Sequence, residues 1–153
     1  MNILSLVSSN SGSTFAANQI VNDALIAAGH TVTVKNPKEA SPDELTQADA
    51  VVLASPSWDY ETKEGQPHED FFPLLKELEG KTIEGKPFAI LGLGDTSYTH
   101  FCGAVDVFES VIASIKGKLV VASLKIDKFY QNSESTNLVK SWAETLAKSL
   151  IPS

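Results

Sequence analysis

Short apolar runs alternate with segments of helical periodicity along this chain of 153 residues. Runs rich in strand-forming residues predict five strands, at 3–7, 31–35, 50–54, 88–91 and 119–122. Apolar residues at helical spacing predict helices at 14–28, 71–78, 105–115 and 138–150, with a short helix starting at 41. In the first of these helices, one apolar face is predicted to contain Phe15, Ile20, Ala24, Ala27 and Ala28.

Mostly apolar strands separated by helices are typical of a parallel sheet that is covered on both faces. The sequence therefore predicts an α/β fold, a doubly wound sheet forming one domain over residues 1–153. In such sheets, ligands bind outside the carboxyl ends of the strands. The loops after the first, third and fourth strands are thus the places to look for function.

The charge pattern excludes several classes of function. The formal net charge is −7, and all 12 basic residues are lysines, so the chain has no arginine. Such a chain repels a polyanion, which argues against nucleic-acid binding. It also cannot form a bidentate arginine clamp on a phosphate.

Cysteine content and hydropathy suggest where the protein works. The single Cys102 excludes an intramolecular disulfide and a cysteine-rich metal site. No apolar run approaches the roughly 20 residues of a membrane span, and no leader-like segment precedes the first strand. We expect a soluble cytoplasmic protein that is a monomer, with no metal site and no membrane partner.

The first loop has the chemistry of a phosphate site. Residues 8–14 read SSNSGST and lead into the first helix. Unpaired N–H groups and the partial positive charge at a helix start attract anions, hydroxyl groups add donors, and Gly12 allows close approach. An ordinary serine-rich N-cap would have the same appearance. The loop lacks the Gly-Lys-Ser/Thr of a Walker motif and the G-x-G-x-x-G of a dinucleotide site.

The other two loops contain aromatic residues that we expect to be exposed to solvent. Trp58 lies in the polar turn 55–60, and Tyr98 lies in the glycine-rich loop 92–103. Two aromatic rings from neighbouring loops could hold a flat ring between them. A phosphate site together with an aromatic slot describes a flat phosphorylated cofactor, although local packing of Trp58 is an alternative. Trp142, on the last helix, is expected to pack in the core.

These three loops resemble those of the flavodoxin family. Residues 9–14 resemble its phosphate motif [ST]-x-[ST]-G-x-T, and 55–59 (SPSWD) resemble the loop whose tryptophan covers one face of the flavin. The run GDTSY at 94–98, followed by FCGAVD at 101–106, resembles the loop whose tyrosine covers the other face. The resemblance spans the chain and implies a flavodoxin-like doubly wound five-stranded parallel sheet of order 2-1-3-4-5, of the short-chain type.

The resemblance also implies FMN as cofactor and assigns its contacts. The implied cofactor-binding residues are Ser9, Asn10, Ser11, Gly12, Ser13 and Thr14 for the phosphate, and Ser55, Pro56, Ser57, Trp58, Asp59, Gly94, Asp95, Tyr98, His100, Phe101 and Cys102 for the rest. No catalytic residue is implied. Residue 59 is Asp where short-chain relatives often have Gly, and the stretch from 59 to 70 looks longer than usual.

By resemblance, the protein is a low-potential one-electron carrier that shuttles electrons from a reductase to acceptor redox enzymes. The acids at 59, 61, 64, 69 and 70, against Lys63 alone, form a negative rim that is suited to basic partner surfaces, or simply a solvated loop. The alternative function is an FMN-dependent NAD(P)H:quinone reductase of the same fold. A phospho-receiver domain is disfavoured because the first and third strands do not end in acidic residues.

Overall fold

The computed structural model describes residues 1–8, 12–56, 58–60, 63–94, 103–127 and 134–150. Its main sheet runs in the order β2-β1-β3-β6-β7, and β8 also pairs with β6. The strands of this sheet are β1 (Asn2–Val7), β2 (Thr31–Lys35), β3 (Ala50–Pro56), β6 (Pro87–Gly94), β7 (Lys118–Leu119) and β8 (Leu124–Asp127). All its pairings are parallel. The predicted order 2-1-3-4-5 is confirmed.

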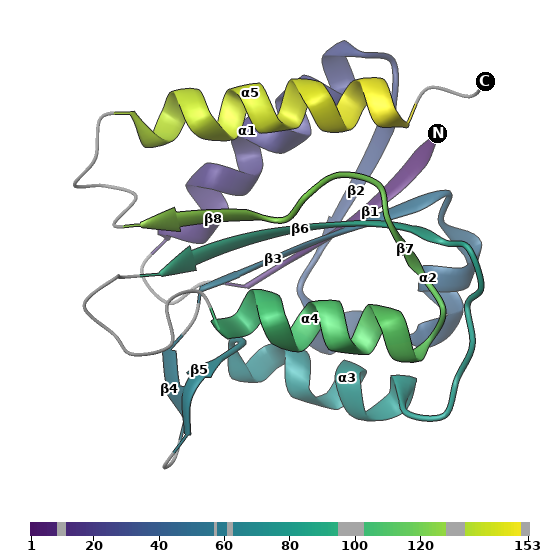
Figure 1. Cartoon of the computed structure of the whole chain (residues 1–153). Helices are drawn as coiled ribbons and strands as arrows, with labels where there is room; N and C mark the ends of the chain where they lie inside the picture. The colour runs from purple at the N-terminus through teal and green to yellow at the C-terminus, as the bar shows by residue number, and fades with distance from the viewer. Residues whose placement is uncertain (9–11, 57, 61–62, 95–102, 128–133, 151–153) are drawn as a thin grey trace.

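Helices cover both faces of this sheet (Figure 1). One face carries α1 (Ser13–Ala27) and α5 (Ser135–Ser149), and the other carries α2 (Pro42–Gln47), α3 (Phe72–Leu78) and α4 (Gly103–Ser114). Two short 3-10 turns, η1 (Pro37–Glu39) and η2 (Glu69–Phe71), precede α2 and α3. The chain therefore forms three layers, as the alternation of strands and helices predicts.

Alternation along the central strands divides the core in two. In β1, Ile3 and Val7 face the α1 and α5 layer, whereas Leu4 and Leu6 face the α2, α3 and α4 layer. Because successive strand side chains point to opposite faces, a strand buried on both sides is mostly apolar along its whole length. On the second face, the rings of Phe71 and Phe108 meet edge to face with centroids 4.8 Å apart.

The predicted packing face of α1 differs from the buried one. The buried residues of this helix are Thr14, Ala17, Asn18, Val21, Asn22 and Leu25, whereas Phe15 is 48% exposed. Ile20 and Ala24 pack only partly against the core, and Ala27 and Ala28 are exposed. The prediction failed because polar residues occupy the buried face: the Asn18 amide donates to Ser5 Oγ of β1 at 2.8 Å.

The fifth strand is interrupted rather than continuous over 119–122. β7 pairs with the start of β6, and β8 resumes the pairing near its end. The Trp142 indole N–H donates to the Ala122 carbonyl at the interruption, at 2.8 Å. Trp142 itself is 9% exposed, which confirms its predicted place in the core.

A two-stranded hairpin fills part of the region predicted to be a loop. It consists of β4 (Trp58–Tyr60) and β5 (Lys63–Gln66), which pair antiparallel. The hairpin extends beside α4, at the same end of the molecule as the carboxyl ends of β6 and β8 (Figure 1).

Candidate functional site

The carboxyl ends of β1, β3 and β6 lie together at one edge of the sheet. Val7 of β1 is paired with Ala54 of β3, and Ser55 and Pro56 of β3 are paired with Gly92 and Leu93 of β6. Beyond β1, the Ser8 amide still donates to the Ala54 carbonyl at 3.3 Å. The three loops selected from the sequence therefore leave the sheet side by side.

The start of α1 has the features of a phosphate site. Gly12 is the N-cap with φ +88°, and its carbonyl accepts the Ala16 amide at 3.0 Å. Thr14, in the first helical turn, is 1% exposed, and its Oγ1 has no hydrogen-bond partner among the described residues. A buried hydroxyl without a partner is costly unless a ligand completes it. This hydroxyl, together with the N–H groups of the helix start, fits a phosphate group. Ser9, Asn10 and Ser11 lie outside the described residues, and the role of Ser13 stays a prediction.

The loop after β3 is held by one serine. Ser55 is fully buried, and its Oγ donates to the Pro56 carbonyl at 2.8 Å and accepts the His68 amide at 2.9 Å. This hydroxyl fixes the point at which the chain leaves the sheet and the point at which it returns after the hairpin. Its predicted contact with a cofactor stays a prediction.

The hairpin contains two of the predicted ring-binding residues. Trp58 and Asp59 belong to β4, where Trp58 pairs with Gln66 and Tyr60 pairs with Lys63. The register of this pairing shifts between Trp58 and Tyr60, so Asp59 lies at an irregularity of an otherwise extended ribbon. Ser57 lies outside the described residues.

The loop after β6 contributes one described residue. Gly94 ends the strand and pairs with Asp127 of β8. The other predicted residues of this loop, Asp95, Tyr98, His100, Phe101 and Cys102, lie outside the described residues. The chain is described again from Gly103, the first residue of α4.

Asp70 does not belong to a solvated acidic rim. Its side chain is 17% exposed, and its Oδ2 accepts the Ser8 hydroxyl and the Asn36 amide, each at 2.9 Å. Lys38 Nζ lies 3.7 Å from its Oδ1. Burial raises the pKa of Asp70, but the hydrogen bonds from Asn36 and Ser8 and the charge of Lys38 outweigh burial, and the pKa lies below its ordinary value. The carboxylate is therefore charged at neutral pH.

The sequence did not predict this network, whose other members are Ser8, Asn36 and His68. One signal was available: Asn36 follows β2, which also ends at the carboxyl edge. Among the described residues, no group of three histidine, cysteine or acidic side chains is arranged to hold a metal ion. No described helix combines the length and apolar character that crossing a membrane requires.

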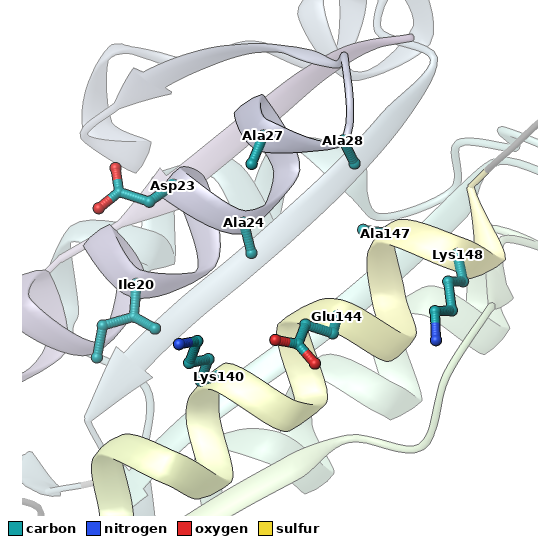
Figure 2. Close-up of a pocket in the computed structure, with 9 residues that line it drawn as sticks. All are labelled: Ile20, Asp23, Ala24, Ala27, Ala28, Lys140, Glu144, Ala147 and Lys148. Carbon is teal, nitrogen blue, oxygen red and sulfur yellow. The ribbon is translucent and has the colours of Figure 1, made fainter.

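A separate groove lies between α1 and α5, as Figure 2 shows. It has a volume of about 560 Å³ and is lined by Ile20, Asp23, Ala24, Ala27, Ala28, Lys140, Glu144, Ala147 and Lys148. These residues occupy the middle and the carboxyl-terminal parts of the two helices. The carboxyl edge of the sheet adjoins the other end of α1, next to Gly12. The groove is therefore distinct from the candidate site.

Comparison with known proteins identifies the family. The Flavodoxin family profile matches residues 6–142. The flavodoxin of Maridesulfovibrio salexigens is 33% identical over 140 residues, which are 91% of this chain and 92% of that protein. Oxidised flavodoxin 2 from Bacillus cereus is 28% identical with a TM-score of 0.87, over 97% of this chain and 99% of that one. The sulfite reductase (NADPH) flavoprotein alpha-component of Yersinia enterocolitica is 32% identical over 137 residues, which are 77% of this chain but 23% of that protein. Sequence and fold agree over nearly the whole chain, which belongs to the flavodoxin family.

Proposed function

We propose that this protein is a one-electron carrier that uses non-covalently bound FMN. The start of α1 carries the proposal. Its glycine N-cap and the buried Thr14 hydroxyl, which has no hydrogen-bond partner among the described residues, follow β1 at the carboxyl edge of the sheet, where this fold binds its ligands. Members of the flavodoxin family are FMN-dependent electron carriers, and the site on this chain has the donors that the phosphate of FMN needs.

One set of residues in the site would bind the phosphate of FMN, and another set would bind its flavin ring. Gly12, Ser13 and Thr14 would hold the phosphate with helix N–H groups and a hydroxyl, without a positive side chain. Trp58 and Tyr98 would flank the flavin ring and exclude water from its faces. When bound, FMN supplies the one-electron chemistry, and the protein sets its potential through charge and exposure.

We further propose that the partners are redox proteins with basic docking surfaces. The acidic rim is defined here as Asp59, Glu61, Glu64 and Glu69, without Asp70, whose carboxylate is turned inward. Charges of this kind steer encounter and raise the association rate more than the affinity. Electron transfer to a basic acceptor should therefore slow as ionic strength rises. The monomeric state and the cytoplasmic location expected from the sequence stay predictions.

The alternative is an FMN-dependent NAD(P)H:quinone reductase of the same fold. Similarity to a flavoprotein component of sulfite reductase covers only 23% of that protein, so it supports a shared flavin-binding fold and adds no nicotinamide site to this chain. We propose that the protein has no substrate turnover of its own.

Two measurements on the purified protein test the proposed function. Acid release of the bound flavin and chromatography should give FMN, whereas mainly FAD would contradict the single phosphate site. The holoprotein mixed with NADPH and a soluble quinone should show no turnover unless a separate reductase is added. Rapid quinone reduction by the protein alone would favour the enzyme.

A further inference from the structure

The segment 68–70, between the hairpin and α3, joins the ends of three neighbouring strands. The His68 amide donates to Ser55 Oγ, near the end of β3, at 2.9 Å. The Asp70 carboxylate accepts Ser8, which follows β1, and Asn36, which follows β2. One turn of chain thereby connects β1, β2 and β3 at the carboxyl edge of the sheet.

The bonds in this network are partly shielded from water. Ser8 is 1% exposed, His68 is 5% exposed, and the Asp70 side chain is 17% exposed. The Asp70 amide donates to His68 Nδ1 at 3.1 Å, which fixes the backbone of the turn. Hydrogen bonds to a carboxylate are about twice as strong as neutral ones, and burial strengthens them further. The network therefore holds Ser8 firmly.

The position of Ser8 matters for the site. Ser8 is followed at once by residues 9–14, the predicted phosphate-binding segment. The other end of this segment is set by α1, where Thr14 is 1% exposed. A shift of Ser8 would therefore move the start of the predicted phosphate-binding segment. It would not move the ring-binding loops in the same way, because they follow β3 and β6.

Charge repulsion alone would disfavour placing the Asp70 carboxylate near a phosphate site. A carboxylate close to a phosphate site repels the phosphate dianion, and only Lys38, at 3.7 Å, forms an ion pair with Asp70 among the described lysines. Removing the charge would then strengthen binding of FMN. A role in holding the chain predicts the opposite sign, because losing the carboxylate frees Ser8.

We propose that Asp70 is a positioning residue for the phosphate end of the FMN site, acting through the Ser8 hydroxyl. The inference rests on the proposed function, because it assumes that FMN is the ligand. It predicts that the network serves the phosphate specifically. Riboflavin, which has the same ring and no phosphate, should be insensitive to it.

The test compares FMN and riboflavin on the same apoprotein by fluorescence titration. Asp70→Ala removes the acceptor, Asp70→Asn keeps its shape without the charge, and Ser8→Ala removes only the donor. Asp49→Ala is the control, because the Asp49 carboxylate also accepts a hydrogen bond next to a strand end. Its donor is the Asn2 backbone amide, at 2.7 Å, and it lies at the opposite edge of the sheet. Glu69→Gln removes the neighbouring exposed charge without touching the network.

We expect Asp70→Ala to weaken FMN binding about ten-fold or more relative to riboflavin, the size of a lost charged hydrogen bond. Ser8→Ala should lower the ratio of FMN affinity to riboflavin affinity the least, and Asp70→Asn should lower it by an intermediate amount. Asp49→Ala should leave this ratio unchanged. Glu69→Gln should leave FMN affinity equal or slightly higher. Retained riboflavin binding shows that the variants are folded.

Three outcomes would overturn the inference. FMN could bind more tightly to Asp70→Ala, which would make the carboxylate a purely electrostatic neighbour. The affinities for FMN and riboflavin could fall equally, or Ser8→Ala could leave the ratio of the two affinities unchanged. Either result would mean that the network stabilises the fold in general and has no specific role at the phosphate. If the wild-type apoprotein does not prefer FMN over riboflavin at all, the proposed function fails rather than the role of Asp70.

Discussion

Replacing Gly12 by Ala tests whether the start of α1 binds the phosphate. Gly12 has φ +88°, and a Cβ built on it would have no atom within 4 Å. The substitution therefore creates backbone strain but no steric clash in the ligand-free protein. Left-handed backbone costs most residues about 1–2 kcal/mol.

Gly29 supplies a matched control at the other end of the same helix. It has φ +96°, and a Cβ there also has no atom within 4 Å. Gly12→Ala and Gly29→Ala should each lower the free energy of unfolding of the apoprotein by about 1–2 kcal/mol. Only Gly12 adjoins the predicted phosphate, so only its substitution should weaken FMN binding, by about ten-fold or more if one charge-assisted hydrogen bond is lost.

The assay pairs urea unfolding of each apoprotein with fluorescence titration of FMN. Unfolding reports the strain that is common to both positions, and titration reports the effect specific to the ligand. If Gly12→Ala binds FMN as tightly as Gly29→Ala does, the phosphate does not approach the α1 N-cap, and the reasoning is refuted.

Three other predictions concern the ring end of the site. Trp58→Ala and Tyr98→Ala should each weaken FMN binding and ease uptake of the second electron, because water then reaches an anionic flavin; unchanged potentials in spectroelectrochemistry would count against the aromatic slot. Glu64→Gln combined with Glu69→Gln should raise the potential of the second electron and slow electron transfer to a basic acceptor at low salt. The rise in potential is at most about 60 mV for each charge ~12 Å away, at an effective dielectric constant of ~20 and before screening by salt. Asp59→Gly should raise the potential of the first electron by tens of millivolts, because we expect the backbone after Trp58 to turn left-handed on reduction, which costs Asp more than Gly. Each kcal/mol of that cost corresponds to about 40 mV, and Asp59→Asn is the charge control; an unchanged or lower potential would show that the backbone at this position does not adjust on reduction.

The sheet could be predicted from sequence because its strands are buried on both faces. A strand such as β3 has no polar face to interrupt its apolar run from Ala50 to Ala54. The carboxyl-end rule then placed Gly12, Pro56 and Gly94 at one edge without any knowledge of side-chain contacts. These parts of the prediction depend only on topology.

The sequence predictions were less accurate where polar residues are buried or paired with distant parts of the chain. The buried side of α1 carries Asn18 and Asn22, so apolar periodicity pointed to a neighbouring face. The β4–β5 hairpin has a polar strand, Lys63–Gln66, whose pairing comes from its partner rather than from an apolar pattern. Asp70 looked like part of an acidic rim because its partners Ser8 and Asn36 are 62 and 34 residues away. Contacts between distant segments leave no local signal in a single sequence.

The most direct test of the proposed function is a reductive titration of the holoprotein, followed by visible absorption without oxygen. A one-electron carrier predicts two separate one-electron steps, with the one-electron-reduced flavin as the main species midway through the titration. Direct conversion from the oxidised to the fully reduced flavin, with no intermediate spectrum, would contradict the assignment of this protein as a one-electron carrier.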